Sequence, residues 1–509
     1  MPQPRWVTAL AAVVVLAAAA HLCVDALTHH ASWTNNDNAL ILFISSQMAG
    51  GARLYIDWLD PALPSIFFIA RIAVGISRLG VPVVLAYNLL VLAAGLIGVV
   101  VLMRALRVLE APRSAVVLTV GAYVFFLMKA GALTRDFGQR EHLFALLLVP
   151  ELFFVLSGDR PRWRPLWCAT LAFTATIKPH FVAIVALLEA TAPADRRPSR
   201  ADLAGFAAGA VAPFVLLWGH SSASFRALFT ETIDLHLSGA YALLNASPRV
   251  LLTRGPLVDF ALGAVAIALA MRAARQRAGA AAIAWRGSAL IVMAALAVVH
   301  QQKYFPYHFT PLFGLAVVVG AWAAGGVLDG RPALVSNGLA AAVVLFGAGL
   351  FHLDVARNAE PISVRLARVI GVREPTMAVA SIYSHGLCTP FPDAPRCLGP
   401  EAQAPRLPFA ASQPDGDRGV RRWASAFGSV IRRERPDLVV ISTSSTARMP
   451  GQRTPAEILL REFPSVGPDY VPLTPAVERE VGARNWLVLR RRDVPEATRA
   501  NGSTWPVLH

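Results

Sequence analysis

Apolar runs long enough to cross a membrane recur along the first 352 residues, separated by short polar connectors. A membrane-spanning helix needs about 20 mostly apolar residues, and fewer when its ends are anchored or its partners are helices. On this template the sequence predicts eleven spans, near residues 7–27, 81–103, 114–130, 142–157, 166–179, 181–193, 202–219, 256–272, 287–300, 308–326 and 333–352. The pattern therefore predicts an α-helical polytopic membrane domain over residues 1–352.

The loop between the first two spans, residues 28–80, contains two further apolar stretches. Residues 39–48 are apolar enough to lie as a helix in the membrane interface. After Pro61 and Pro64, residues 65–76 form a second apolar stretch of helical length. We therefore expect a helical, membrane-associated first loop.

Composition and charge support membrane insertion and set the orientation. The 509 residues are 55% hydrophobic and 16% charged, and the mean hydropathy is +0.51, outside the usual soluble range. The net charge of +15 does not indicate nucleic-acid binding, because the arginines gather in short connectors without a basic helix or an aromatic RNA-binding motif. With a cytoplasmic N-terminus, the positive-inside rule is satisfied by the connectors that hold Arg5, Arg104, Arg107, Arg113, Arg160, Arg162, Arg164, Arg196, Arg197, Arg200, Arg272, Arg275, Arg277, Arg286 and Arg331.

The tail, residues 353–509, is rich in Pro and Arg and contains only short apolar runs, at 377–382, 438–441 and 486–489. These runs, with amphipathic stretches between them, predict a small α/β domain outside the membrane, on the extracytoplasmic side. There Cys388 and Cys397 could form a disulfide or remain two free thiols. The abundant Ala, Arg and Gly suggest a GC-rich bacterial source, and so a multi-pass protein of the inner (plasma) membrane.

The polar residues that could take part in catalysis or binding fall in the connectors expected on the extracytoplasmic side. The first loop holds an early carboxylate, Asp37, and a later group, Tyr55, Asp57 and Asp60. A carboxylate at such a site can remove a proton from a hydroxyl group. We therefore take the three aspartates as catalytic candidates and Tyr55 as a substrate-binding candidate.

The connector at residues 134–142 concentrates ionisable groups between two spans. Arg135 and Arg140 are candidates for binding phosphate, because a guanidinium matches phosphate oxygens with two hydrogen bonds. Gln139 and Glu141 are candidates for contacting the rest of a substrate. A purely structural network of arginine and carboxylate explains the same residues.

Two further connectors on this side carry cations beside aromatic or imidazole groups. Lys178 precedes Pro179 and His180 in an otherwise apolar stretch, which suggests a phosphate contact or, alternatively, a tight turn whose lysine reaches the head groups. The connector at 300–308 suits a sugar and a phosphate, although an aromatic belt accounts for its rings equally well. Its candidates are Lys303 for phosphate, and Gln302, Tyr307 and His308 for substrate.

Three features of the first loop carry a resemblance to a known family: an Asp just after the first span, a Gly-Gly and Tyr-x-Asp about twenty residues later, and a following Pro-rich helix start. In these features the loop resembles that of the GT-C class of membrane glycosyltransferases. This class includes protein O-mannosyltransferases and bacterial aminoarabinose transferases. The resemblance implies a polyprenyl-phosphate sugar as donor, a glycan, lipid or protein as acceptor, and Asp37 as the base that deprotonates the acceptor hydroxyl. The class usually has a second acid at the position of Asn38, so that role would pass to Asp57 or Asp60.

Other functions fit the sequence less well. No Gly-rich nucleotide loop, Cys/His metal pattern or internal repeat is evident. We therefore expect no cofactor, and nothing in the sequence supports a divalent metal, although the class contains both metal-using and metal-free members. The alternatives are a transporter or flippase and a non-catalytic binding protein. Glu151, inside a span near its cytoplasmic end, is expected to pair with another helix.

Overall fold

A computed structural model describes the fold of most of the membrane region and parts of the tail. It describes residues 36–58, 60, 62–129, 137–233, 247–252, 254–302, 304–329, 335, 338–340, 342–343, 346, 366–367, 375–380, 396–398, 427–429, 431–442, 469–474 and 486–495. These residues group into two compact units, which are described separately.

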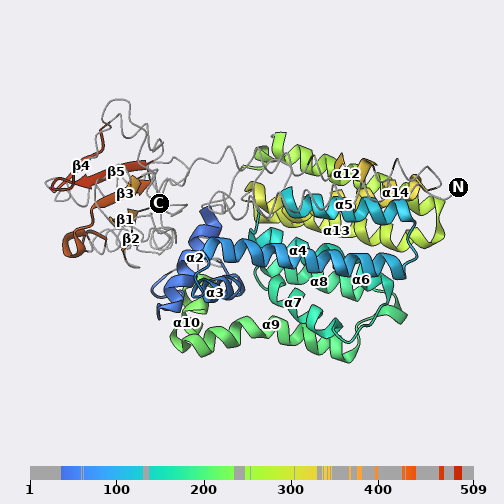
Figure 1. Cartoon of the computed structure of the whole chain (residues 1–509), viewed down its shortest axis with the longest axis horizontal. Coiled ribbons are helices and arrows are strands. Elements are labelled where there is room, and N and C mark those ends of the chain that lie inside the picture. The colour runs from blue at the N-terminus through green and yellow to red at the C-terminus, as the bar shows by residue number, and fades with distance from the viewer. Residues whose placement is uncertain are drawn as a thin grey trace. The chain divides into compact units, whose positions relative to one another are not determined.

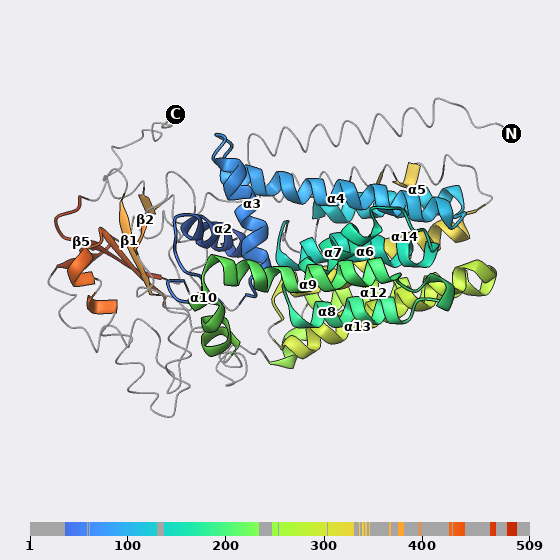
Figure 2. The same cartoon turned by 90° about the horizontal axis from the view of Figure 1, so that it is seen from below.

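Most helices of the first unit run side by side along one direction and form a bundle (Figures 1 and 2). Its α-helices are α3 (Ser65–Ser77), α4 (Val83–Val108), α5 (Arg113–Lys129), α6 (Arg140–Ser157), α7 (Arg164–Ala175), α8 (Pro179–Ala190), α9 (Arg200–His220), α12 (Arg254–Gln276), α13 (Ala281–Gln301) and α14 (Thr310–Val327). Short turns η2 (Ala194–Arg196), η5 (Pro248–Leu252), η6 (Ala278–Ala280) and η7 (Pro306–Phe309) lie in the connectors.

The hydropathy pattern predicted these helices well. Each expected span from 81–103 to 308–326 coincides with one of the helices α4 to α9 or α12 to α14. The first span, 7–27, lies outside the described residues, as does most of the last, 333–352. Within the described chain, five helices are long and apolar enough to cross a membrane by themselves. The apolar segments and the fold together identify a polytopic membrane protein.

Helix α6 forms the centre of the bundle. Every residue from Glu141 to Leu156 is buried, because α4, α7, α8, α13 and α14 all pack against it. Such a helix is apolar on all sides except at positions where a polar side chain has a partner. Its few polar residues are therefore held in defined environments.

Glycine allows α14 to approach α5 closely. A Cβ atom at Gly325 would lie 2.7 Å from the backbone nitrogen of Ala115, closer than real contacts permit. The hydroxyl of Ser114 donates to the Gly325 carbonyl at 2.7 Å across the same contact. Small residues at helix crossings serve this purpose in membrane bundles.

The second unit includes residues 39–61 of the first loop and the described parts of the tail. Helix α2 (Asn36–Ala49) matches the expected interfacial segment 39–48, and its first turn, Asn36–Asn38, groups with the first unit. The edge-to-face packing of Phe43 on Trp58 folds the loop back on α2. Helix α10 (Ser222–Ala227) and the π-helical turn η3 (Leu228–Ile233) belong to this unit as well.

The tail forms a five-stranded mixed sheet with the order β2-β1-β3-β5-β4. The strands are β1 (Thr376–Ala380), β2 (Arg396–Cys397), β3 (Leu438–Ser442), β4 (Tyr470–Pro472) and β5 (Trp486–Arg491). Strand β1 pairs in parallel with β2 and β3, and β5 pairs antiparallel with β3 and β4. The three apolar runs of the tail coincide with β1, β3 and β5, in agreement with the expected α/β domain.

Two polar side chains stabilise this sheet through hydrogen bonds and an ion pair. The Asp437 carboxylate accepts hydrogen bonds from the backbone nitrogen (2.8 Å) and hydroxyl (2.9 Å) of Thr376 and pairs with Arg491 at 3.1 Å. The hydroxyl of Tyr470 donates to the Pro436 carbonyl, and burial raises the pKa of Tyr470 to about 12. Cys397 is disulfide-bonded, which agrees with the disulfide alternative, and Cys388 lies outside the described residues.

Candidate functional site

Ionisable side chains from three separate connectors meet at one end of the bundle. Lys178 is the N-cap residue of α8, and its ammonium donates to the Glu141 carboxylate at the start of α6. The same ammonium donates to the side-chain oxygen of Gln301, the last residue of α13, at 3.0 Å. Residues far apart in the sequence thus form one cluster, to which Lys178 is central.

The turn η7 adds an imidazole and an aromatic ring to this cluster. The His308 Nε2 lies 3.8 Å from the Glu141 carboxylate, and the Lys178 ammonium lies 5.8 Å from the centre of the Tyr307 ring. Tyr307 and His308 pack edge to face. A cation beside a ring face is held by the ring quadrupole as well as by its hydrogen bonds.

Asp37 and Arg140 form a second ion pair, adjacent in sequence to the first. The Arg140 guanidinium lies 3.7 Å from the Asp37 carboxylate, and the side chains are 14% and 17% exposed. Because Arg140 and Glu141 are neighbours at the start of α6, the two pairs belong to one site. Asp37, Arg140, Glu141, Lys178, Gln301, Tyr307 and His308 are hereafter the Asp37–Lys178 cluster.

A tight turn before α6 sets the position of Arg140 and Glu141. Gly138 has a φ of 72°, in the left-handed region that suits glycine. Its carbonyl accepts from the Tyr87 hydroxyl at 2.6 Å, and its nitrogen donates to His142 Nδ1 at 3.0 Å. The amide of Asn38 donates to the Phe137 carbonyl at 3.0 Å, which ties the start of α2 to this turn.

Several buried polar atoms of the site have no hydrogen-bond partner among the described residues. They are Gln139 Nε2, Glu141 Oε2 and His180 Nε2. Buried polar atoms in native proteins are nearly always satisfied, so such a group of exceptions indicates a place for a ligand or for water. The site therefore offers hydrogen-bonding capacity to a polar molecule.

Burial and neighbouring charges act on Lys178 in opposite directions. Desolvation lowers the pKa of Lys178, whereas the carboxylates of Glu141 and Asp37 raise it and so oppose the effect. The side chain is 15% exposed. A cation held at a desolvated site interacts more strongly with an incoming anion than one in bulk water.

The other candidates of the first loop lie in the second unit. Asp57 pairs with Arg53 on the surface at 2.9 Å and accepts from the Arg53 backbone nitrogen at 2.7 Å. Asp60 is buried, as is Tyr55, which has a φ of 68°. Burial, followed by the charge of Asp60, raises the pKa of Tyr55 well above its usual value.

The remaining candidates divide into described and undescribed residues. Gln302 is exposed at the C-cap of α13, and Arg135 and Lys303 lie outside the described residues. Sequence reasoning missed the contact of Gln301 and the support from Tyr87; only their positions at helix ends on the same side hinted at either role. Among the described residues, no three His, Cys, Asp or Glu side chains are arranged to hold a metal ion.

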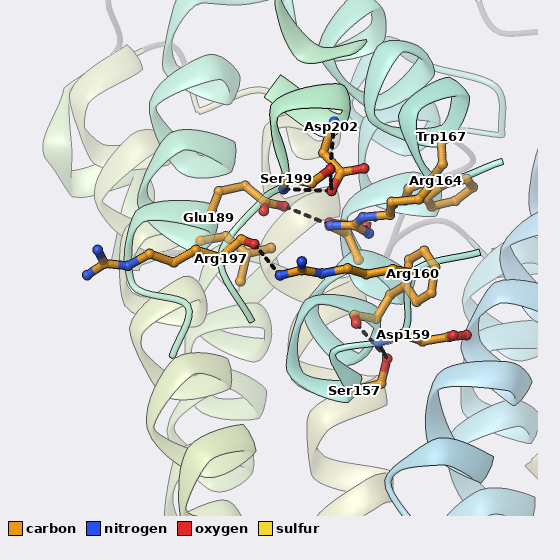
Figure 3. Close-up of polar contacts among 12 residues, drawn as sticks. Ser157, Asp159, Arg160, Arg164, Trp167, Glu189, Arg197, Ser199 and Asp202 are labelled. Atoms are coloured by element: carbon orange, nitrogen blue, oxygen red, sulfur yellow. Dashed lines mark hydrogen bonds and ion pairs between the residues drawn. The ribbon is translucent and has the colours of Figure 1, made fainter. Parts of the chain in front are cut away.

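A second buried polar cluster lies within α6, α7 and α8. Arg164 donates to both Glu151 oxygens at 2.8 and 2.5 Å, and the Trp167 indole donates to the same carboxylate at 2.6 Å. Glu189 lies 3.5 Å from the Arg164 guanidinium (Figure 3). The helix pairing expected for Glu151 is therefore present. Glu151, Arg164, Trp167 and Glu189 are hereafter the Arg164 cluster.

A search of solved structures gives the fold a known counterpart. The chain is similar to ArnT from Cupriavidus metallidurans, whose crystal structure contains undecaprenyl phosphate. The similarity covers 94% of this chain and 98% of that chain, with a TM-score of 0.58 and 14% sequence identity. No protein-family model matches the sequence, and no curated protein matches it. The chain thus has an ArnT-like fold, which agrees with the GT-C resemblance of its first loop.

Proposed function

We propose that this protein is a membrane glycosyltransferase that transfers a sugar from a polyprenyl-phosphate donor to an acceptor hydroxyl on the extracytoplasmic side. The observation that carries the proposal is the Asp37–Lys178 cluster, which places a carboxylate and two cations together on an ArnT-like fold. ArnT binds undecaprenyl phosphate in its crystal structure, and a lipid of this kind is the donor class we assign here.

In the proposed reaction, Asp37 accepts the proton of the acceptor hydroxyl as its oxygen attacks the anomeric carbon of the donor sugar. The bond between that carbon and the phosphate oxygen breaks, and its electron pair leaves with the phosphate. Arg140 and Lys178 stabilise the negative charge that develops there. The products are the glycosylated acceptor and the polyprenyl phosphate.

Glu141 has a supporting role in this scheme. Its carboxylate holds the Lys178 ammonium through a hydrogen bond, and α6 fixes it beside Arg140. The unsatisfied Gln139 Nε2 and Glu141 Oε2 atoms suit the hydroxyl groups of a sugar. We assign His180, Tyr307 and His308 to the same substrate-binding surface.

The position of the cluster favours this proposal over transport. Transporters concentrate binding groups near mid-membrane, on interrupted helices related by internal repeats. Arg140 begins α6, Lys178 caps α8 and Gln301 ends α13. The charged groups therefore gather at helix ends, where a lipid phosphate and an acceptor hydroxyl can meet.

The test is transfer of radiolabelled sugar from a panel of polyprenyl-phosphate sugars by the purified, lipid-reconstituted protein. Asp37→Asn should abolish transfer, because the near-isosteric amide cannot accept the proton. Asp57→Asn is the matched control, since Asp57 is a surface carboxylate paired with Arg53. Full transfer by Asp37→Asn, with loss in Asp57→Asn, would move the catalytic role to Asp57.

A further inference from the structure

A cavity of about 670 Å³ lies between α7, α8 and α9, and no residue of the Asp37–Lys178 cluster lines it. Its volume falls within the range of about 300–1,000 Å³ that is usual for small-molecule sites. On α8 it is lined by Val182, Val185 and Ala186, which share one helix face. Leu203 and Phe206 of α9 and two alanines of α7 complete the apolar walls.

The cavity exists because α9 is fixed against α7 and not against α8. A Cβ atom at Gly205 or Gly209 would collide with the backbone carbonyl of Pro165 or Ala169, so these glycines bring α9 against α7. On the side of α8, the small side chain of Ala186 leaves the space open. The backbone packing thus forms the cavity, and no rearrangement of side chains is needed to open it.

One end of the cavity is cationic. Arg197 and Pro198, in the connector between α8 and α9, line this end. Arg160 donates to the backbone carbonyl of Arg197 at 2.8 Å and so holds the connector in place. Figure 3 shows the Arg197 side chain directed away from Arg164, Glu189 and Asp202. Within the described chain, no carboxylate pairs with Arg197, which is exposed.

Glu189 also lines the cavity. Its carboxyl group lies 3.5 Å from the Arg164 guanidinium, which also pairs with Glu151, so it faces the Arg164 cluster and not Arg197. The cavity therefore presents apolar walls along its length and the Arg197 guanidinium at one end. Arg160 and Arg162 lie in the connector between α6 and α7, and Arg196 lies beside Arg197 between α8 and α9. The positive-inside rule places both connectors in the cytoplasm.

We propose that this cavity binds an anionic phospholipid of the cytoplasmic leaflet, with one acyl chain between α8 and α9 and the head-group phosphate on Arg197. The apolar walls match the acyl chain, and a guanidinium matches the phosphate oxygens with two hydrogen bonds. Anionic lipids of this leaflet are attracted to juxtamembrane arginines. Charge complementarity therefore favours an anionic head group over a zwitterionic one.

The test is native mass spectrometry of the purified full-length protein, titrated separately with phosphatidylglycerol and phosphatidylcholine that carry identical acyl chains. The wild type should bind one phosphatidylglycerol at least about tenfold more tightly than phosphatidylcholine, a difference of about 1.4 kcal/mol. Arg197→Gln should reduce the affinity for phosphatidylglycerol to that for phosphatidylcholine. Ala186→Phe should fill the cavity and weaken binding of both lipids.

Matched controls separate this site from general lipid contact. Arg162→Gln removes an exposed arginine of the neighbouring connector that does not line the cavity, and Ala208→Phe adds the same ring to an exposed position of α9 that does not line it. Both should leave lipid binding unchanged. Glycerol phosphate, which has no acyl chain, should not displace the lipid.

Three results would overturn the proposal. The first is an equal loss of affinity for phosphatidylglycerol in Arg162→Gln and Arg197→Gln. The second is equal affinity for both lipids in Ala186→Phe and the wild type. The third is displacement of the lipid by glycerol phosphate, which would indicate a soluble phosphate site. Because Arg197 is exposed in a connector, Arg197→Gln decides the question even if Ala186→Phe does not fold.

Discussion

The bundle holds two polar clusters with similar composition whose central carboxylates differ in hydrogen bonding. In the Arg164 cluster, Arg164 and Trp167 satisfy both oxygens of Glu151, and the side chains of Glu151 and Arg164 are 0% and 6% exposed. Glu189, at the edge of this cluster, has no hydrogen-bond partner for its carboxyl oxygens among the described residues. In the Asp37–Lys178 cluster, Glu141 Oε2 has no hydrogen-bond partner among the described residues, as is the case for Gln139 Nε2 beside it.

This difference distinguishes a structural contact from a site for chemistry. The Glu151–Arg164 pair, whose carboxylate is fully hydrogen-bonded, has no capacity left for a ligand, so its role is to hold helices together. The Glu141–Lys178 pair keeps an unsatisfied carboxylate oxygen, which costs stability unless a ligand or water completes it. We therefore expect changes in the Arg164 cluster to affect folding, and changes in the Asp37–Lys178 cluster to affect binding and transfer.

The largest effect should follow from breaking the Arg164 cluster. Arg164→Met leaves the Glu151 and Glu189 carboxylates buried without their cation and should lower the free energy of unfolding by about 3–5 kcal/mol. Chemical denaturation in detergent micelles measures this change. In the double variant Glu151→Met with Arg164→Met, the free energy of unfolding should fall much less, because neither charge of that pair remains.

The next effect should appear in transfer and not in stability. Lys178→Met removes a cation from the proposed phosphate site and should reduce the rate of sugar transfer by about 10²–10³-fold, or about 2.7–4 kcal/mol of transition-state stabilisation. Its free energy of unfolding should not fall to the extent expected for Arg164→Met. If Lys178→Met instead lowered the free energy of unfolding as much as Arg164→Met and left the rate of transfer unchanged, the contrast between the clusters would be wrong.

A smaller effect should follow from removing one hydrogen bond of the Arg164 cluster. Trp167→Phe keeps the ring but removes the indole N–H that donates to Glu151. Hydrogen bonds to charged groups are worth about 1.5–3 kcal/mol, so the free energy of unfolding should fall by that amount. The rate of transfer at a temperature well below unfolding should stay at the wild-type level.

The subtlest expected change concerns pH. Glu141 raises the pKa of Lys178 against the lowering effect of burial, so Glu141→Gln should lower that pKa. Lys178 must be protonated to stabilise phosphate, and activity is lost as the pH rises through its pKa. The alkaline limb of the pH–rate profile should therefore move to lower pH in Glu141→Gln, and an unchanged limb would argue against Lys178 as the titrating cation.

The sequence predicted local elements better than contacts between them. Hydropathy identified α2, α3 and the spanning helices, because each depends on the apolar character of its own segment. The strands β2 and β4 have only two and three residues and left no such signal.

The composition of the two clusters depends on tertiary packing. Gln301 meets Lys178 across 123 positions of the chain, and Glu189 joins Arg164 from another helix, so neither contact has a local signature. The surface pair of Arg53 and Asp57, by contrast, lies four positions apart within one turn of the first loop, so it depends on local structure alone. The catalytic roles of Asp37, Asp57 and Asp60 stay predictions.

The most direct test of this account is equilibrium binding of radiolabelled polyprenyl phosphate to the purified protein, with wild type, Lys178→Met and Arg162→Gln compared under identical conditions. We predict that Lys178→Met weakens binding at least about tenfold, or about 1.4 kcal/mol, whereas Arg162→Gln, at the other end of the bundle, binds like the wild type. Equal affinity in all three proteins would show that the Asp37–Lys178 cluster does not hold the lipid phosphate, and would contradict the central claim.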